Sequence, residues 1–121
     1  MDMSDVYNAT RGVSLAAETE WAGSLWSRMR GLLGRSVRDF QPGKGLLISP
    51  SQGIHTIGMS FPIDVVYIDS KGHILRIYHQ LAPFGIAAVM FRTHSILELP
   101  PGTLQRTRTA VGDVLEIRPV T

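Results

Sequence analysis

The chain has 121 residues, of which 44% are hydrophobic and 18% are charged, and its formal net charge is +2. This length suits one globular domain, which we expect over residues 1–121, because roughly two-thirds of the unfolded surface can be buried without a disulfide or metal staple. Cysteine is absent, which excludes disulfides, thiolate zinc sites and a cysteine nucleophile. No apolar run approaches the ~18 residues of a membrane span, and residues 1–5 do not resemble a signal peptide. We therefore expect a cytoplasmic protein without a membrane partner; an envelope location would need an export segment upstream of Met1.

The first predicted elements are a strand and a helix. Residues 6–17 mix small and β-branched residues, which favours one extended strand. Apolar residues then recur at the three-and-four spacing of a buried helical stripe, which predicts an amphipathic helix over about residues 20–33. Thr19 is expected to cap this helix. The predicted core-facing residues are Trp21, Ala22, Leu25, Trp26, Met29, Leu32 and Leu33.

The remaining sequence predicts a β core over about residues 45–118. Residues 45–48 form a short apolar strand, and residues 63–68 are β-branched and long enough for a strand that is buried on both faces. Asp69 and Gly72 begin and end a type I turn. Residues 73–81 return as the partner strand, and alternation places one set of side chains on each face: Leu75, Ile77, His79 and Leu81 against Arg76, Tyr78 and Gln80.

Residues 95–99 and 114–118 are the last predicted strands, with a short helical turn over residues 104–107, capped by Thr103, between them. About six or seven strands and one real helix indicate an α+β protein that is mostly β. The expected architecture is a small antiparallel or mixed β barrel or sandwich with one packed amphipathic helix.

Candidate binding residues gather just before the long central strand. His55 could move a proton or bind a ligand, and Thr56 could donate and accept hydrogen bonds. Asp64 enters an apolar run, where an ionised carboxylate is costly without a partner. The alternative is structural: His55 and Asp64 could bond backbone groups that the loop leaves unpaired. His55-x-x-x-Met59 and Met90-x-x-x-His94 pair imidazole with thioether, but neither segment is a predicted helix, so we expect no metal and no cofactor.

Glu98 is a further candidate, because it stands among apolar residues in the strand 95–99. It could form an acid–base pair with Asp64, or alternation could turn it to solvent. The leading hypothesis is a binding module for a small polar ligand or a peptide, with a pocket lined by the His55–Phe61 loop, which Asp64 holds, and with Arg92 or Glu98 at its rim.

Two alternatives remain open. One is a hydrolase in which His55 acts with Asp64 or Glu98 as acid and base. The other is a nucleic-acid or protein interaction domain that uses the basic segment from Arg28 to Lys44. A nucleic-acid partner is disfavoured, because no helix-turn-helix signature or aromatic RNA-binding motif occurs. Oligomeric state and catalytic residues stay open.

Three segments resemble domain-of-unknown-function family 192, a group of small uncharacterised bacterial and archaeal proteins. Arg30–Arg35 resembles its G-L-M/L-G-R, and His55–Gly72 resembles its H-T-x-G-M-x-F-P-I-D-V-x-F-x-D-x-x-G. Leu97–Gly102, followed by Gly112-Asp113, resembles its L-E-L-P-A-G … G-D. The resemblance covers most of Trp21 to Ile117 and implies a mixed, barrel-like β fold with one packed helix. It implies no activity, and the secretion or anchor segment that many members carry is not seen in these residues.

Overall fold

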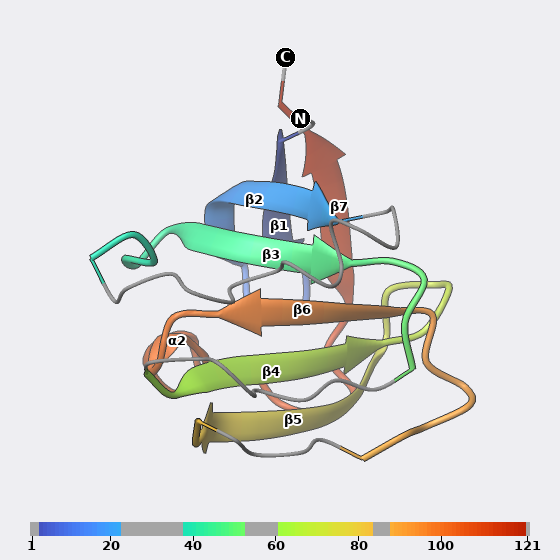
Figure 1. The fold of residues 1–121 in the computed structure, drawn as a ribbon. Helices are drawn as coiled ribbons and strands as arrows, with labels where there is room; N and C mark the ends of the chain where they lie inside the picture. Colours follow the sequence, from blue (N-terminus) through green and yellow to red (C-terminus); the bar gives the residue numbers. More distant parts are fainter. Residues whose placement is uncertain (1–2, 23–37, 53–60, 84–87, 121) are drawn as a thin grey trace.

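A computed structural model describes residues 3–22, 38–52, 61–83 and 88–120 of the chain. In these residues one seven-stranded sheet has the order β5-β4-β6-β3-β2-β1-β7 (Figure 1). The β2–β3 pair is parallel, and the other neighbouring strands run antiparallel. The elements are β1 Met3–Asn8, β2 Val13–Ala22, β3 Lys44–Ile48, β4 Ile63–Ile68, β5 Ile74–Leu81, β6 Ser95–Leu99, α2 Thr103–Thr107 and β7 Leu115–Pro119. The mostly β, mixed fold is thus confirmed, as a single curled half-barrel rather than a two-sheet sandwich.

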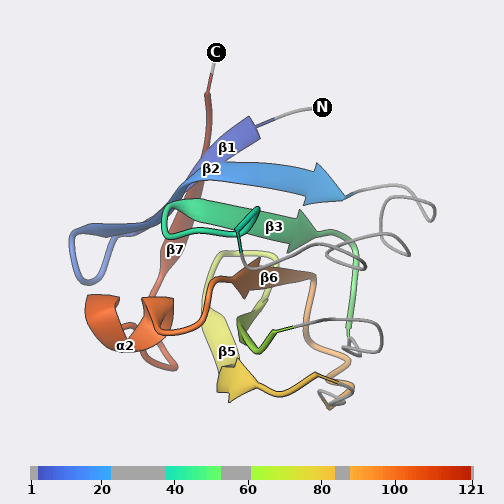
Figure 2. The ribbon, with the colours of Figure 1, turned by 60° about the vertical axis from the view of Figure 1, so that its left-hand side comes forward.

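The curl brings the two edge strands of the sheet together at one end (Figures 1 and 2). His73, just before β5, forms an isolated antiparallel bridge with Val114, just before β7. The Leu115 amide donates to the Gly72 carbonyl over 2.8 Å, and the Ile74 amide donates to the Asp113 carbonyl over 2.9 Å. These bonds satisfy backbone groups that would be unpaired at open sheet edges.

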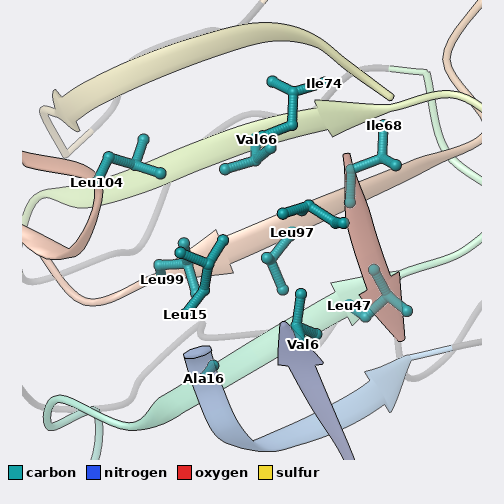
Figure 3. Packing of buried hydrophobic residues seen from close by; sticks show 11 residues of the cluster. Val6, Leu15, Ala16, Leu47, Val66, Ile68, Ile74, Leu97, Leu99 and Leu104 are labelled. Carbon is teal, nitrogen blue, oxygen red and sulfur yellow. The ribbon is translucent and has the colours of Figure 1, made fainter. Parts of the chain in front are cut away.

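The inner cluster fills the space inside the curl (Figure 3). It draws side chains from all seven strands and from α2, which is why the sheet must curve around it. Burial of this much apolar surface is the main driving force for such a fold. Its buried members are Val6, Leu15, Ala16, Leu47, Val66, Ile68, Ile74, Leu97, Leu99, Leu104 and Leu115.

The outer cluster lies on the other face of the central strands β3, β6 and β4. It contains Phe40, Leu46, Ile48, Phe61, Ile63, Val65, Tyr67 and Ile96. The apolar residues of β4 alternate between the two clusters, and all six residues of the strand are buried. The prediction of a strand buried on both faces is therefore confirmed.

The N-terminal predictions need correction. The single strand expected over residues 6–17 is a hairpin of β1 and β2, because the chain turns at residues 9–12 and the Gly12 amide donates to the Asn8 carbonyl over 2.8 Å. The first residues of the helix expected over 20–33 belong to β2, and so does its expected cap, Thr19. Residues 18–22 pair in parallel with residues 44–48, and this ladder overrides the helical spacing. Trp21, expected in the core, is 43% exposed. Residues 23–33 lie outside the described part.

The β core also begins earlier than residue 45, since β1 and β2 belong to the same sheet. Later elements agree better with the predictions. The Gly72 amide donates to the Asp69 carbonyl over 3.2 Å, as the predicted turn requires. The short helix is confirmed as α2, but Gly102 holds the N-cap position and the Thr103 hydroxyl instead donates to the Pro100 carbonyl over 2.8 Å.

Strand β5 does not keep the simple alternation that was expected. Its register against β4 shifts twice, because extra β5 residues are inserted as bulges. One shift falls beside Gln80, whose φ is 52°. As a result Leu75, Tyr78 and Leu81 pack on the outer cluster, whereas Ile74 and Ile77 pack on the inner cluster. His79 is exposed.

A buried polar network ties the β1–β2 turn to the approach to β7. The Asp113 carboxylate accepts hydrogen bonds from the Asn8 amide group over 3.0 Å and from the Arg11 guanidinium over 2.9 Å. The Ala110 backbone amide donates to the same oxygen over 3.0 Å. Burial alone would raise the pKa of Asp113, but these bonds outweigh it and hold the pKa below its usual value.

Candidate functional site

Glu98 is a buried carboxylate in the middle of the outer face. It lies on β6 and is only 6% exposed. In the sheet register it faces Leu46 on β3 and Val65 on β4, and both belong to the outer cluster. Cross-strand partners share one face of a sheet, so the Glu98 side chain lies on the outer face. The expectation that alternation could turn it to solvent is wrong.

Two segments far apart in the sequence meet on this same face. Phe61, the last residue of the predicted His55–Phe61 binding loop, is a buried member of the outer cluster, where its ring lies 6.1 Å from that of Phe40. Met90 packs against the same cluster from the segment before β6. The end of the predicted loop and Glu98 are therefore brought to one face of the sheet.

Asp64 lies on the opposite face. It pairs with Leu99, an inner-cluster residue, whereas its neighbour Val65 pairs with Glu98. Its two carboxylate oxygens accept backbone amides of Gln80 and Leu104, each over 2.9 Å. Asp64 thus holds the β5 bulge and the start of α2 through backbone amides, as the structural alternative for this residue expected.

Asp64 and Glu98, considered above as an acid–base pair, are not brought together, because the sheet separates the two side chains. Arg92 is exposed, in a turn where the Thr93 amide donates to the Met90 carbonyl over 3.0 Å. His55, Thr56 and Met59 lie outside the described residues.

Most of the predicted basic segment from Arg28 to Lys44 also lies outside the described residues. Of its described cations, Arg38 is exposed and Lys44 forms an ion pair with Glu18. That ion pair joins β3 to β2, where Glu18 and Lys44 are register partners. The Lys44 charge is therefore partly neutralised within the fold.

Two tyrosines beside this face were missed by the sequence analysis. The Tyr67 hydroxyl donates to the Ala88 carbonyl, and the Ala88 amide donates to the Tyr78 hydroxyl over 2.9 Å. Their rings lie 5.9 Å apart, and the Arg76 guanidinium lies 4.8 Å from the centre of the Tyr78 ring. The pair fixes the backbone that leads to Met90. Without the β5 bulge beside Gln80, the pairing of β5 with β4 that starts at Leu81 would place Tyr78 on the inner face. The bulge therefore explains why Tyr78 lies beside Tyr67 on the outer face.

Tyr67 is expected to ionise unusually late in an alkaline titration. Burial, reinforced by Tyr78 and opposed by Arg76, raises the pKa of Tyr67 from 10.0 to about 12. The stability that depends on its neutral phenol is thus fully present below pH 10 and is lost as the pH rises through about 12. Phenolate absorbance should show this late step, and Tyr67→Phe should remove it, whereas Tyr7→Phe should leave it. A late step that survives Tyr67→Phe would contradict the assignment.

Fold and site together define a small half-barrel protein with a buried acidic side chain on its outer face and no recognised catalytic group among the described residues. Residues 6–117 match the family DUF192, described as "Uncharacterized ACR". The chain belongs to this family, as the resemblance of its motifs predicted. No curated protein matches it.

Two solved structures are similar to this chain. One is a protein of unknown function from Novosphingobium aromaticivorans DSM 12444, with a TM-score of 0.82 and 17% identity, covering 95% of this chain and 84% of that chain. The other is a proposed transcription regulator from Sinorhizobium meliloti 1021, with a TM-score of 0.77 and 26% identity, covering 96% of this chain and 92% of that chain. Both support the half-barrel fold. No helix in the described part of the chain is long and apolar enough to cross a membrane.

Proposed function

We propose that the chain is a binding module for a small polar ligand that carries a hydrogen-bond donor, such as an amine or the amino end of a peptide. The observation that carries the proposal is the position of Glu98, buried between Leu46 and Val65 on the face that also receives Phe61. The ligand would lie on this outer face, next to the root of the His55–Phe61 loop, with Arg92 at the rim.

The chemistry of the face favours recognition over catalysis. Ligand sites are mostly apolar surfaces with a few polar groups that set orientation, and Glu98 within the outer cluster has this composition. A carboxylate forms its strongest hydrogen bonds with charged donors, and low polarity around it strengthens them. A ligand with an ammonium group attached to a short apolar chain would therefore match both Glu98 and the surrounding apolar side chains.

A thermal-shift comparison tests this proposal. Wild type and Glu98→Gln are screened against amines, amino acids and short peptides. A ligand present at about 100 times its Kd adds about 2.7 kcal/mol to the free energy of unfolding, which corresponds to a rise of several degrees in Tm. We expect at least one amine to raise the Tm of wild type and to lose most of this effect with Glu98→Gln.

The matched control is Glu116→Gln, which makes the same change at a half-exposed carboxylate on β7. This variant should respond to the same amine as wild type does. A screen in which no amine stabilises wild type, or in which both variants respond equally, would contradict the proposal.

Two other functions have weaker support. A hydrolase that uses Asp64 as its acid or base would have to release a carboxylate that is 0% exposed and bonded to two backbone amides. A nucleic-acid interaction role rests on the predicted basic segment, and the S. meliloti relative is described as a proposed transcription regulator. Strongly salt-dependent binding to duplex DNA would favour that role over ours.

A further inference from the structure

The segment before β6 exposes two large apolar side chains that are two residues apart in the sequence. Phe91 is 84% exposed and Val89 is 64% exposed, whereas Met90 between them packs on the outer cluster. Figure 1 shows this segment, in light orange, projecting beyond the strands between β5 and β6. Isolated exposed apolar residues are common, but two of them only two residues apart in a projecting segment are a candidate interaction site.

The turn is held in place by hydrogen bonds rather than by the two exposed side chains. The Met90 amide donates to the Gln52 carbonyl, and the Gln52 side-chain amide donates to the Phe91 carbonyl, each over 2.9 Å. Tyr67 and Tyr78 fix the backbone at Ala88. Phe91 is therefore presented outward by a supported backbone, and its removal should not affect folding.

The two stretches of sequence that meet at this turn, residues 40–63 and 70–97, carry basic but no acidic residues. No Asp or Glu occurs between Asp39 and Asp64 or between Asp69 and Glu98 in the sequence. The basic residues in these intervals are Lys44, which is paired with Glu18, and Lys71, Arg76 and Arg92. Arg92, directly after Phe91, is itself exposed. An apolar tip beside a basic residue is complementary to an anionic lipid surface, where aromatic side chains enter the interface and cations meet the headgroups.

The small apolar area of Val89 and Phe91 argues against a protein partner. A fully buried aromatic side chain contributes about 150–250 Å². Phe91 and Val89 together thus fall well short of the ~800 Å² that each partner of a stable protein complex buries. A bilayer interface needs no such complementary area, because a few apolar side chains can enter it from a convex turn.

We infer that Val89, Phe91 and Arg92 form a docking tip for an anionic membrane surface. Phe91 and Val89 are exposed and take no part in the outer cluster, so they are separate from the ligand proposed for Glu98, whereas Arg92 also lies at the rim of that ligand site. Binding through so few groups is weak and salt-sensitive, as expected for a protein that associates with lipid reversibly.

Vesicle co-sedimentation tests this inference. The intact chain is mixed at low salt with vesicles of phosphatidylcholine and phosphatidylglycerol, or of phosphatidylcholine alone. We expect binding to the anionic vesicles only. Phe91→Ser should lower the partition coefficient about tenfold or more, because it removes the largest apolar group from the interface. Arg92→Gln should lower it about fivefold, with less salt dependence.

The chain offers a matched pair of valines for the control. Val89 lies at the tip, and Val111, which is 58% exposed, lies in the turn before β7. Val89→Ser should weaken vesicle binding, whereas Val111→Ser should not, and both should keep the Tm of wild type. No binding of wild type to anionic vesicles, or equal losses for the two valine variants, would overturn the inference. So would a wild-type dimer that Phe91→Ser dissociates, which would make a second copy of the chain the partner.

Discussion

Asp64→Ala is expected to lower the free energy of unfolding by about 3–5 kcal/mol, because hydrogen bonds to charged groups contribute about 1.5–3 kcal/mol each. The Asp64 carboxylate accepts the Gln80 amide at the β5 bulge and the Leu104 amide in the first turn of α2. Gly102 at the N-cap of α2 has no side chain that could cap it, so Asp64 performs this task from β4. Denaturation by urea measures the effect.

Two further variants make the Asp64 result specific. Asp64→Asn keeps one acceptor oxygen but turns an amide donor toward a backbone donor, so its loss should be smaller, about 1–3 kcal/mol. Glu116→Ala removes an exposed carboxylate and should change stability by less than about 0.5 kcal/mol. If Asp64→Ala unfolds within about 1 kcal/mol of wild type, the structural role assigned to this carboxylate is wrong.

Gly72→Ala should cost at least about 3 kcal/mol, since it combines backbone strain with a steric clash. Gly72 has a φ of +90°, and a Cβ atom there would lie 2.3 Å from the Leu115 carbonyl oxygen. Relief requires the turn to move away from β7, which would break the bond from the Leu115 amide to the Gly72 carbonyl. The loss of stability is measured by urea denaturation.

Gly112→Ala separates the two causes. Its φ is +93°, close to that of Gly72, but an added Cβ meets no atom within 4 Å. This variant should therefore show the backbone strain alone, about 1–2 kcal/mol. Equal losses for the two glycine variants would mean that an added Cβ at residue 72 does not clash with the Leu115 carbonyl oxygen, which contradicts the close approach of the two segments.

Local patterns predicted most of the central sheet. Residues 63–68 form β4 because a run of β-branched and apolar residues fits a strand between two clusters. The turn from Asp69 to Gly72 was also predicted, since its chemistry is local. The failures came from distant pairing. Residues 20–22 carry a helical pattern but lie in β2, because their parallel partners on β3 are more than twenty residues further along the chain.

The site was predicted only in part, again because its geometry depends on pairing between residues that are distant in the sequence. Glu98 was found because a lone acid among apolar residues is conspicuous, but its face depends on the register of β6 against β3 and β4. Asp64 was found by the same pattern and proved to bind backbone amides on the other side of the sheet. The contacts of Tyr67 and Tyr78 with Ala88 depend on the β5 bulge, which leaves no clear mark in the sequence.

The most direct test of the binding role is to map backbone amide chemical shifts while an amine identified by thermal shift is added. If Glu98 binds this ligand, the largest changes should gather at Leu46, Phe61, Val65 and Glu98, and Glu98→Gln should abolish them. Changes that spread over β1 and β7 and leave the outer face unchanged would contradict the account.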